Sequence, residues 1–361
     1  MRIGIDISQI VYKGTGVGRF TEGLVEAICT NNREHEWVFF FSGLRKRLNK
    51  DIEKKILKKG FTLVKRKVPP SFLSLMWNTL HTFPIESMTG KLDWFITSDW
   101  TEPPANCKKA TVIHDLTVFR YPETVDSKIL KTQKKRLRWI SKESSLVFAD
   151  SETTKKDIRR YLPELKAPVQ TVYPGVEVKR STLTRDQLKK KFGIKNDFIL
   201  SVGKLEPRKN LVNLLQAFEK VNLSRTELLI VGQQGWGAKL EPQKNVKMLG
   251  YVSDDELAGL YRECLFFIYP SLWEGFGYPV VEAMKYGAAV ATSKTSSLGE
   301  IAEGVGLTFD PTDVNDIVQC LRLLSTNKKT RDELKRKSLK RGQDFSWKTY
   351  YSAMEKALVN S

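Results

Sequence analysis

The segment "YPSLWEGFGYPVVEAMKYG", residues 269–287, places two glutamates, Glu274 and Glu282, in a stretch rich in glycine and aromatic residues. The apolar run "LFFIYPS" that begins at residue 265 is typical of a buried strand. Pro279 suits the first position of a helix, because its missing N–H is not needed there. We therefore expect a strand, a glycine-rich loop and a helix, with Glu282 in the helix's first turn, where its charge is favourable.

This loop suits a ligand that carries both phosphate and hydroxyl groups. Gly275 and Gly277 allow the backbone to approach a ligand closely, and a helix that starts after glycine-rich backbone favours anions. Carboxylates accept hydrogen bonds from sugar or ribose hydroxyls. A sugar nucleotide has both kinds of group. The simpler alternative is an ordinary helix cap with a glutamate at a favourable terminus.

Apolar runs alternate with amphipathic segments on both sides of this stretch. Near-continuous apolar strands that alternate with helices predict parallel sheets covered on both faces, so we expect an α/β fold. In such folds ligands bind at the carboxyl ends of the strands. Strands are expected at 2–8, 37–43, 92–99, 109–116, 145–151 and 169–177, and again at 197–204, 226–232, 246–252, 265–271, 288–294 and 305–311.

The length of 361 residues accommodates two domains of ordinary size. The two strand–helix series meet near residues 175–195, which predicts two doubly wound domains. Four cysteines without a CxxC pair argue against a zinc ribbon or a disulfide framework and fit a reducing compartment. We expect no signal peptide, because the chain opens on the strand-like "RIGIDIS", and no membrane span, because no run of about 18 apolar residues exists.

The formal net charge is +19, and two acid-free clusters at 54–67 and 128–139 contribute strongly to it. Such clusters attract nucleic acid or anionic lipid. The alternative is a solvated basic surface without a partner. A nucleic-acid-binding protein is a different class of hypothesis, but the chain has no nucleic-acid motif, so no nucleic-acid partner is expected.

Two further motifs lie at expected strand ends. "SVGKLEPRKN", 201–210, brings Lys204, Arg208 and Lys209 to a helix start, where a basic trio suits a diphosphate. A solvated basic loop is the alternative. "VIHDL" places His114 at a strand end, where it is either functional or a satisfied core histidine.

The loop "KGTGVGRF", 13–20, is glycine-rich but is not a GxGxxG motif, because Arg19 stands where the third glycine would be. As a dinucleotide signal it is weak. We interpret it as a flexible loop at the carboxyl edge of the sheet.

The segment "EGFGYPVVEAM" resembles the signature of family-four retaining glycosyltransferases. "GVGRF", "HDL", "ADSETTKKDI", "VYPGVE", "VGKLEPRKN", "LLIVGQQGW" and "LGYVSDDEL" follow the family's order over nearly the whole chain. The chain looks most like bacterial mannosyltransferases of surface polysaccharide assembly. The resemblance implies a GT-B fold, with two Rossmann-like domains that face a central cleft. These would be an acceptor domain, 1–175, onto which the C-terminal helix 345–361 packs, and a nucleotide-sugar donor domain, 176–344.

The resemblance also implies roles for single residues. Arg208 and Lys209 would neutralise the donor diphosphate and the charge that develops as the sugar leaves. Glu274 would contact sugar hydroxyls, and Glu282 would accept the ribose hydroxyls. From the first domain, His114 would touch the donor sugar. Further donor contacts would come from Gly16, Lys204, Gly232 and the loop after it, Val252, Gly275, Phe276, Gly277 and Tyr278.

The implied reaction is transfer of a hexose from a nucleoside-diphosphate sugar, with retention of configuration at the anomeric carbon. The resemblance implies neither a metal nor a cofactor, because the nucleoside-diphosphate sugar is a substrate. Mannose from GDP-mannose is favoured, with UDP-glucose or UDP-N-acetylglucosamine as the alternative donors. The acceptor would be a glycan or a lipid-linked sugar. We expect a cytoplasmic enzyme that docks on the inner face of an anionic membrane. The docking surface would consist of the basic clusters and the apolar residues Phe61, Phe72, Leu75, Met76, Trp77 and Trp139. The alternative is an enzyme with a soluble acceptor and a merely basic surface.

Overall fold

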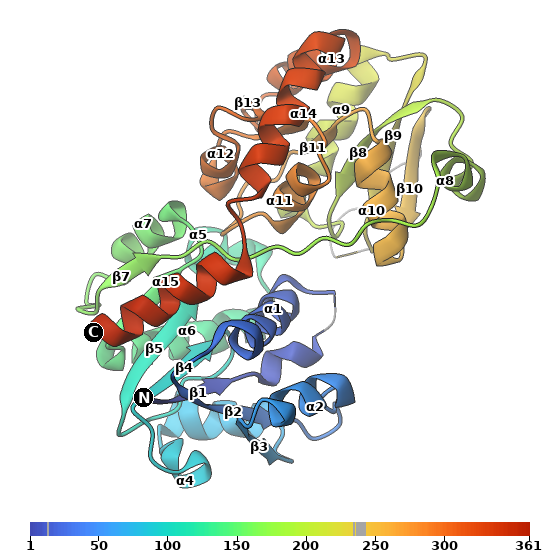
Figure 1. Ribbon diagram of the computed structural model, residues 1–361. Helices are drawn as coiled ribbons and strands as arrows, with labels where there is room; N and C mark the ends of the chain where they lie inside the picture. The colour runs from blue at the N-terminus through green and yellow to red at the C-terminus, as the bar shows by residue number, and fades with distance from the viewer. Residues whose placement is uncertain (13, 234, 236–242) are drawn as a thin grey trace. The chain divides into compact units, whose positions relative to one another are not determined.

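The computed structural model describes residues 1–12, 14–233, 235 and 243–361 (Figure 1). The chain divides into two compact units, which are considered separately. Unit 1 consists of Met1–Gly175 and Ser346–Ser361, and unit 2 of Val176–Phe345. Lys13 of the loop 13–20 and most of the loop after Gly232 lie outside the described residues.

Unit 1 contains a parallel sheet of seven strands in the order β3-β2-β1-β4-β5-β6-β7. The strand order reverses between β1 and β4, which makes this pair the topological switch point of the sheet. The strands are β1 (Arg2–Asp6), β2 (Glu36–Ser42), β3 (Thr62–Arg66), β4 (Trp94–Ser98), β5 (Lys108–Ile113), β6 (Leu146–Ala149) and β7 (Val169–Thr171).

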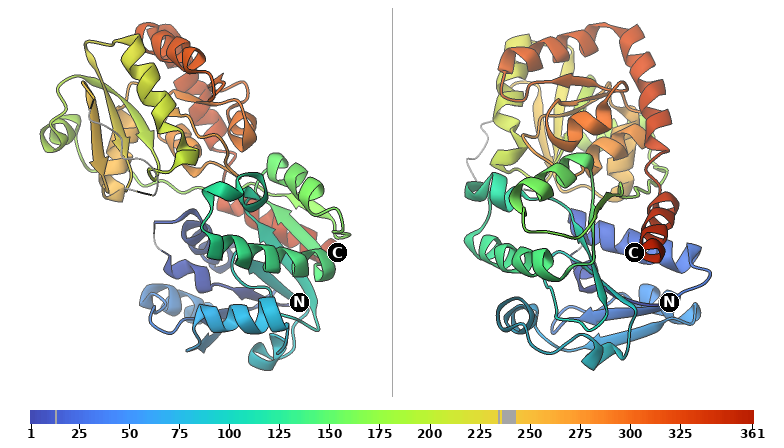
Figure 2. Two further views of the ribbon diagram at one scale, coloured as in Figure 1. Left: turned by 180° about the vertical axis from the view of Figure 1, so that it is seen from behind. Right: turned by 90° about the vertical axis from the view of Figure 1, so that its left-hand side faces the viewer.

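Helices cover both faces of this sheet (Figures 1 and 2). The C-terminal helix α15 lies against α1, where Gly23 leaves room for the ring of Trp347. Ser151 caps α7 by accepting the backbone N–H of Thr154. The helical elements are η1 (Ser8–Val11), α1 (Gly16–Asn31), α2 (Lys50–Lys58), α3 (Pro70–Leu73), η2 (Ser74–Leu80), α4 (Glu86–Thr89), α5 (Thr117–Arg120), η3 (Pro122–Thr124), α6 (Ser127–Glu143), α7 (Glu152–Tyr161) and α15 (Trp347–Asn360).

Unit 2 repeats this plan with a parallel sheet of six strands in the order β10-β9-β8-β11-β12-β13. Its switch point lies between β8 and β11. The strands are β8 (Asp197–Val202), β9 (Thr226–Val231), β10 (Val246–Gly250), β11 (Phe267–Tyr269), β12 (Val290–Ser293) and β13 (Leu307–Phe309).

The core of unit 2 forms where α9 and α13 pack on the sheet through buried leucine, isoleucine and phenylalanine side chains. Ser253 and Glu256 form a capping box at the start of α10. The helical elements are α8 (Arg185–Phe192), η4 (Pro207–Lys209), α9 (Leu211–Val221), α10 (Asp254–Glu263), α11 (Tyr278–Lys285), α12 (Ser296–Ala302), α13 (Val314–Thr326) and α14 (Lys328–Gly342).

The predicted α/β class with two doubly wound, Rossmann-like sheets is confirmed. The predicted start of one helix was wrong, and two elements of unit 1 were not predicted. Helix α11 starts at Tyr278, so Pro279 is its second residue, and Glu282 lies beyond the first turn. The basic cluster 54–67 spans the end of α2 and the edge strand β3, neither of which the sequence pattern predicted.

Candidate functional site at the switch point of unit 2

The loops that follow β8 and β11 bring Arg208, Lys209 and Glu274 together. One carboxylate oxygen of Glu274, Oε1, lies 2.6 Å from Lys209 Nζ, and the other, Oε2, lies 3.0 Å from Arg208 Nη1. Oε1 also accepts hydrogen bonds from the hydroxyls of Tyr269, at 2.9 Å, and Ser271, at 2.6 Å. All three charged side chains are largely buried. They form a two-cation, one-anion cluster with an excess of positive charge.

The two loops are joined by hydrogen bonds to their backbone carbonyl groups. Asn210 adopts a left-handed conformation, with φ of 55°, and its side-chain amide donates to the carbonyls of Pro270 and Pro311. The backbone N–H of Leu272 donates to the Arg208 carbonyl, at 2.9 Å. Arg208 Nη1 also donates to the carbonyl of Trp273. These bonds fix the cluster on the scaffold before any ligand binds.

The electrostatics of the cluster favour its charged form. Burial alone would raise the pKa of the Glu274 carboxyl, but Arg208 and Lys209 outweigh this effect and hold that pKa well below its usual range. Burial lowers the pKa of Lys209, and Glu274 opposes that change. Burial, with the adjacent Glu274 carboxylate, raises the pKa of Tyr269 well above its ordinary value. At neutral pH Glu274 is therefore ionised and Tyr269 is a neutral hydrogen-bond donor.

The predicted donor loop, Gly275 to Tyr278, leads from this cluster directly into α11. Gly277 has φ of 100° and faces Leu298, whose Cδ2 would lie 2.6 Å from an added Cβ, so only glycine fits here. Phe276 is buried and packs edge-to-face against Tyr278. The backbone that approaches the helix start is thus rigidly held.

Glu282 is buried one turn into α11, where its carboxylate accepts a hydrogen bond from the hydroxyl of Tyr261, at 3.0 Å. Gly232 follows β9 and packs against the loop after β8, since an added Cβ would lie 1.9 Å from the Gly203 carbonyl oxygen. Val252 is buried just after β10. The four predicted segments therefore share the carboxyl edge of one sheet, as parallel strands require.

Not every predicted residue joins the cluster. Lys204 is 55% exposed and pairs with Glu206 at 3.1 Å rather than with Glu274. His114 and Gly16 belong to unit 1. Gly16 is the first residue of α1, behind the Thr15 cap. His114 follows β5, and its Nδ1 lies 2.7 Å from Asp150 Oδ2.

Burial lowers the pKa of His114, but Asp150, with help from Asp99, outweighs burial and raises it above the ordinary value. Asp150 was not predicted, and neither were Tyr269 and Ser271 as partners of Glu274. Tyr269 and Ser271 stand in the same quoted segment as Glu274, so their proximity in sequence was an available signal.

Among the described residues, no group of three or more histidine, cysteine, aspartate or glutamate side chains is arranged to hold a metal ion. No helix within the described ranges has the length and apolarity needed to cross a membrane. The four cysteines are free thiols.

Comparisons with known proteins agree with the fold. Residues 184–341 match the family model described as glycosyl transferases group 1. The O-antigen chain mannosyltransferase B of Escherichia coli is 28% identical over 255 residues, which is 66% of this chain and 67% of that protein. Other Escherichia coli mannosyltransferase relatives are longer, and the chain spans only about a quarter of their length.

Among solved structures, a sucrose-phosphate synthase from Thermosynechococcus elongatus superposes with a TM-score of 0.74 at 16% identity, covering 100% of this chain and 98% of the other. The Anabaena protein HepE, in complex with UDP and glucose, gives a TM-score of 0.68 at 14% identity and covers 100% of both chains. The architecture is therefore that of the GT-B glycosyltransferases.

Residues 184–341 therefore carry a group 1 glycosyl transferase domain, and the sequence relatives of the chain include bacterial O-antigen mannosyltransferases. The predicted resemblance to glycosyltransferases and the predicted fold are thereby confirmed.

Proposed function

We propose that this chain transfers a hexose, with mannose from GDP-mannose favoured, to a glycan or lipid-linked acceptor with retention at the anomeric carbon. The observation that carries the proposal is the cluster of Arg208, Lys209 and Glu274 at the unit 2 switch point, next to the start of α11. The mannosyltransferase relatives support mannose. HepE, whose structure holds UDP and glucose, supports the alternative of a UDP-sugar donor.

In this proposal the two cations bind the diphosphate and stabilise its charge as the sugar departs. Glu274 holds both cations in position. Its Oε1 already accepts three hydrogen bonds, whereas Oε2 is paired with Arg208 at 3.0 Å, so Oε2 is the atom that a sugar hydroxyl would share. Glu282 would exchange or share its bond with Tyr261 when it accepts ribose hydroxyls.

Retention through a covalent intermediate needs a carboxylate nucleophile. Glu274 is occupied by two cations and two hydroxyls, and Glu282 is buried against Tyr261, so neither suits that task. We therefore propose front-face attack, in which a phosphate oxygen of the donor takes the acceptor's proton. Residues of this chain bind and orient the reactants without a metal. Detection of a glycosyl group attached to any side chain would contradict this route.

The donor is tested by thermal unfolding with UDP, GDP, ADP and their sugar conjugates. A ligand at 100 times its Kd stabilises the domain that binds it by about 2.7 kcal/mol, and we expect this shift with the guanosine series. The shift should vanish in Arg208→Ala and persist in the control Lys328→Ala, which removes a cation from an exposed position of α14 in the same unit. A shift with the uridine series alone would select the alternative donor. If no nucleotide stabilises the protein, the proposal fails.

Attachment to an anionic membrane is a second part of the proposal, supported by one face of unit 1. Phe72, Leu75, Leu80 and Phe83 are exposed along and just after α3 and η2. Helix α6 packs on η2 and lines a shallow pocket beside it with Lys128, Lys131 and Lys135. Apolar side chains next to lysines suit the interface of an anionic bilayer.

The residues expected to dock need correction. Trp77 is buried, Trp139 stacks on His81 with ring centroids 3.5 Å apart, and Phe61 and Met76 pack into unit 1. Arg136 of the second basic cluster is buried and donates to Thr111 Oγ1. Of the six apolar residues predicted, only Phe72 and Leu75 are freely exposed, and Leu80 and Phe83 were missed.

Vesicle sedimentation tests this surface. The protein should bind vesicles of phosphatidylglycerol and phosphatidylcholine at low salt, and the double variant Phe72→Ser/Phe83→Ser should bind much more weakly. Val359→Ser, which removes an equally exposed apolar side chain from α15, is the matched control. Absence of binding at low salt would leave the soluble-acceptor alternative.

A further inference from the structure

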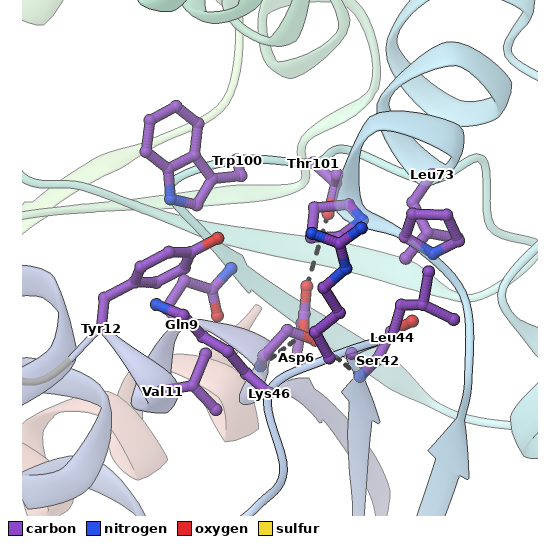
Figure 3. A pocket seen from close by; sticks show the side chains of 15 residues that line it. Asp6, Gln9, Val11, Tyr12, Ser42, Leu44, Lys46, Leu73, Trp100 and Thr101 are labelled. Carbon is purple, nitrogen blue, oxygen red and sulfur yellow. Dashed lines mark hydrogen bonds between the residues drawn. The ribbon is translucent and has the colours of Figure 1, made fainter.

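Two hollows of unit 1 differ in charge. One, of about 370 Å³, lies at the switch point, where Asp6 and Gln9 stand between aromatic and aliphatic side chains such as Trp100 and Leu73 (Figure 3). The other, of about 250 Å³, lies between α6 and η2 and shares no lining residue with the first. In the described part of the chain, three lysines and four residues with hydroxyl groups line it, and no carboxylate does. We call this second hollow the α6–η2 groove, and its lining favours an anion.

The lysines of the groove lie on one face of α6 without acidic partners. Lys128, Lys131 and Lys135 are spaced three and four residues apart, so their side chains are neighbours and repel one another. On α14 the spacing of four residues joins a lysine to an acid instead, in the pair Lys337–Glu333. None of the three groove lysines forms an ion pair with a carboxylate among the described residues. A bound anion would replace this repulsion by attraction.

The start of α6 does not supply the anion site. Asp126 caps this helix, and its Oδ1 accepts the backbone N–H groups of Lys128, at 2.9 Å, and Ile129, at 3.3 Å. An anion in the groove would therefore be bound by side chains, through the ammonium groups and the hydroxyls.

Hydroxyl groups of η2 face the lysines across the groove. Lys135 Nζ donates to Thr79 Oγ1 at 3.0 Å, and Asn78 Nδ2 donates to Ser74 Oγ at 3.3 Å. Because each of these hydroxyl oxygens accepts a bond, its proton can be donated to a ligand. The groove thus offers both cations and O–H donors.

The walls of the groove are fixed on both sides. Trp139 of α6 donates through Nε1 to the carbonyl of Asn78 in η2, at 2.9 Å. The side chain of Asn78 in turn accepts the backbone N–H of Glu102, at 2.9 Å, and donates to the carbonyl of Trp100, at 2.8 Å. These bonds hold η2 on α6 and on the loop after β4, so the groove is formed before a ligand binds.

The lining favours a compact anion with several acceptor oxygens. Lysine ammonium groups bind phosphate as point charges, and hydroxyls donate to its remaining oxygens. The volume is below the range of about 300–1000 Å³ that is usual for drug-sized ligands, so it suits a phosphate group rather than a whole nucleotide. Three cations suit a phosphate monoester, which carries a charge of about −1.5 to −2 at pH 7, better than a singly charged diester.

We propose that the α6–η2 groove binds a phosphate monoester through Lys128, Lys131 and Lys135, and that this group is the headgroup of a membrane lipid. The exposed apolar side chains of Leu75 and Leu80 extend from η2, which forms one side of the groove, and they support the lipid source. This source rests on the membrane attachment proposed above, whereas phosphate binding depends only on unit 1. Such a site makes attachment selective for the headgroup rather than for negative charge alone.

The test is sedimentation of the full chain with phosphatidylcholine vesicles that contain either phosphatidic acid, a monoester, or phosphatidylglycerol, a diester, matched for surface potential. We expect binding to phosphatidic acid to be about tenfold tighter, which is the effect of one additional hydrogen bond to a charged group. Lys128→Ala/Lys131→Ala should abolish this preference. The control Lys134→Ala/Lys142→Ala removes two exposed lysines of α6 that do not line the groove, so it should weaken binding to both vesicles equally and keep the preference.

A soluble probe separates the site from its source. Glycerol 3-phosphate, followed by phosphorus NMR, should bind the wild type and should bind Lys128→Ala/Lys131→Ala about tenfold more weakly. If both vesicles bind equally well, or if the double variant keeps the preference, the proposal is overturned, while membrane attachment through general charge still stands. If glycerol 3-phosphate binds as expected and no vesicle does, the phosphate site stands, and the lipid source and the membrane attachment fail.

Discussion

The switch point of unit 1, between β1 and β4, and that of unit 2, between β8 and β11, occupy equivalent positions, because the order of the six strands of unit 2 matches that of the first six strands of unit 1. Their chemistry is opposite. Unit 2 presents two buried cations that share one carboxylate, whereas unit 1 presents a buried carboxylate and an amide oxygen between aromatic and aliphatic walls. The comparison teaches that the sheet order determines where a ligand binds and that a few side chains after the strands determine which ligand binds.

The largest effect is expected when one of the two buried cations of unit 2 is removed. Arg208→Ala should reduce sugar transfer by about 100-fold or more, because a donor to the developing charge is lost. Lys328→Ala, whose side chain is exposed on α14 and pairs with Asp332, should change the rate little. The measurement is release of nucleoside diphosphate in the presence of acceptor. Equal losses in the two variants would mean that the cluster has no special role.

The second test changes the anion of the same cluster. Glu274→Gln leaves Arg208 and Lys209 buried with a neutral partner, and breaking a buried ion pair in this way costs about 3 kcal/mol or more. We expect the free energy of unfolding at pH 7 to fall by that amount, measured by urea denaturation. Ser271→Ala, which removes one neutral hydrogen bond to Glu274, should cost only about 1 kcal/mol.

The pH dependence of this loss has a definite sign. The pKa of Glu274 is lower in the folded protein than in the unfolded chain, where it is about 4.3. Its contribution is therefore present above that value and is lost as the pH falls through the folded pKa. The difference between wild type and Glu274→Gln should shrink below about pH 4. A difference that stays constant down to pH 3 would show that the ion pair is not its source.

The comparison between the units also shows what sequence alone can predict. Strands buried on both faces, such as Trp37–Ser42, are continuous apolar runs and were found. The edge strand β3 carries Lys65 and Arg66 on exposed positions, so its pattern was hidden in a basic cluster. The start of α11 was misplaced because a residue before proline, here Tyr278, usually avoids the helical conformation.

The site of unit 2 was predicted as separate side chains but not as a cluster. Arg208 and Glu274 lie on different loops, and their ion pair depends on how the backbones of these loops are tied through Asn210. The pocket at the switch point of unit 1 left no signal at all. Asp6 and Thr101 are 95 residues apart, and no spacing in the chain connects them.

A third test concerns how unit 1 is completed by the C-terminal helix. A Cβ added to Gly23 would lie 2.0 Å from the Trp347 ring, so Gly23→Ala should lower the free energy of unfolding by about 1–3 kcal/mol through overpacking. In the background of Trp347→Ala the same change should cost much less, because the ring is gone. Additive effects in this double-mutant cycle would contradict the packing of α15 on α1.

The smallest expected effect is on His114, which follows β5 at the carboxyl edge of the unit 1 sheet. Asp150 keeps the pKa of His114 above its ordinary value although burial lowers it. In Asp150→Asn burial is opposed far less, so the pKa of His114 should fall, and the ring should be neutral at pH 7. The chain has only three histidines, so the ring signals can be assigned by replacing His35 and His81 in turn.

The sign of the linked stability follows from the direction of the shift. With a raised folded pKa, the contribution of His114 is fully present below its unfolded pKa, about 6.5, and is lost as the pH rises through the folded value. Asp150→Asn should therefore be most destabilising on the acid side, near pH 5.5, and least so near pH 8.5. A pKa of His114 that is unchanged in Asp150→Asn would mean that Asp99, after β4, is sufficient to keep the pKa of His114 raised.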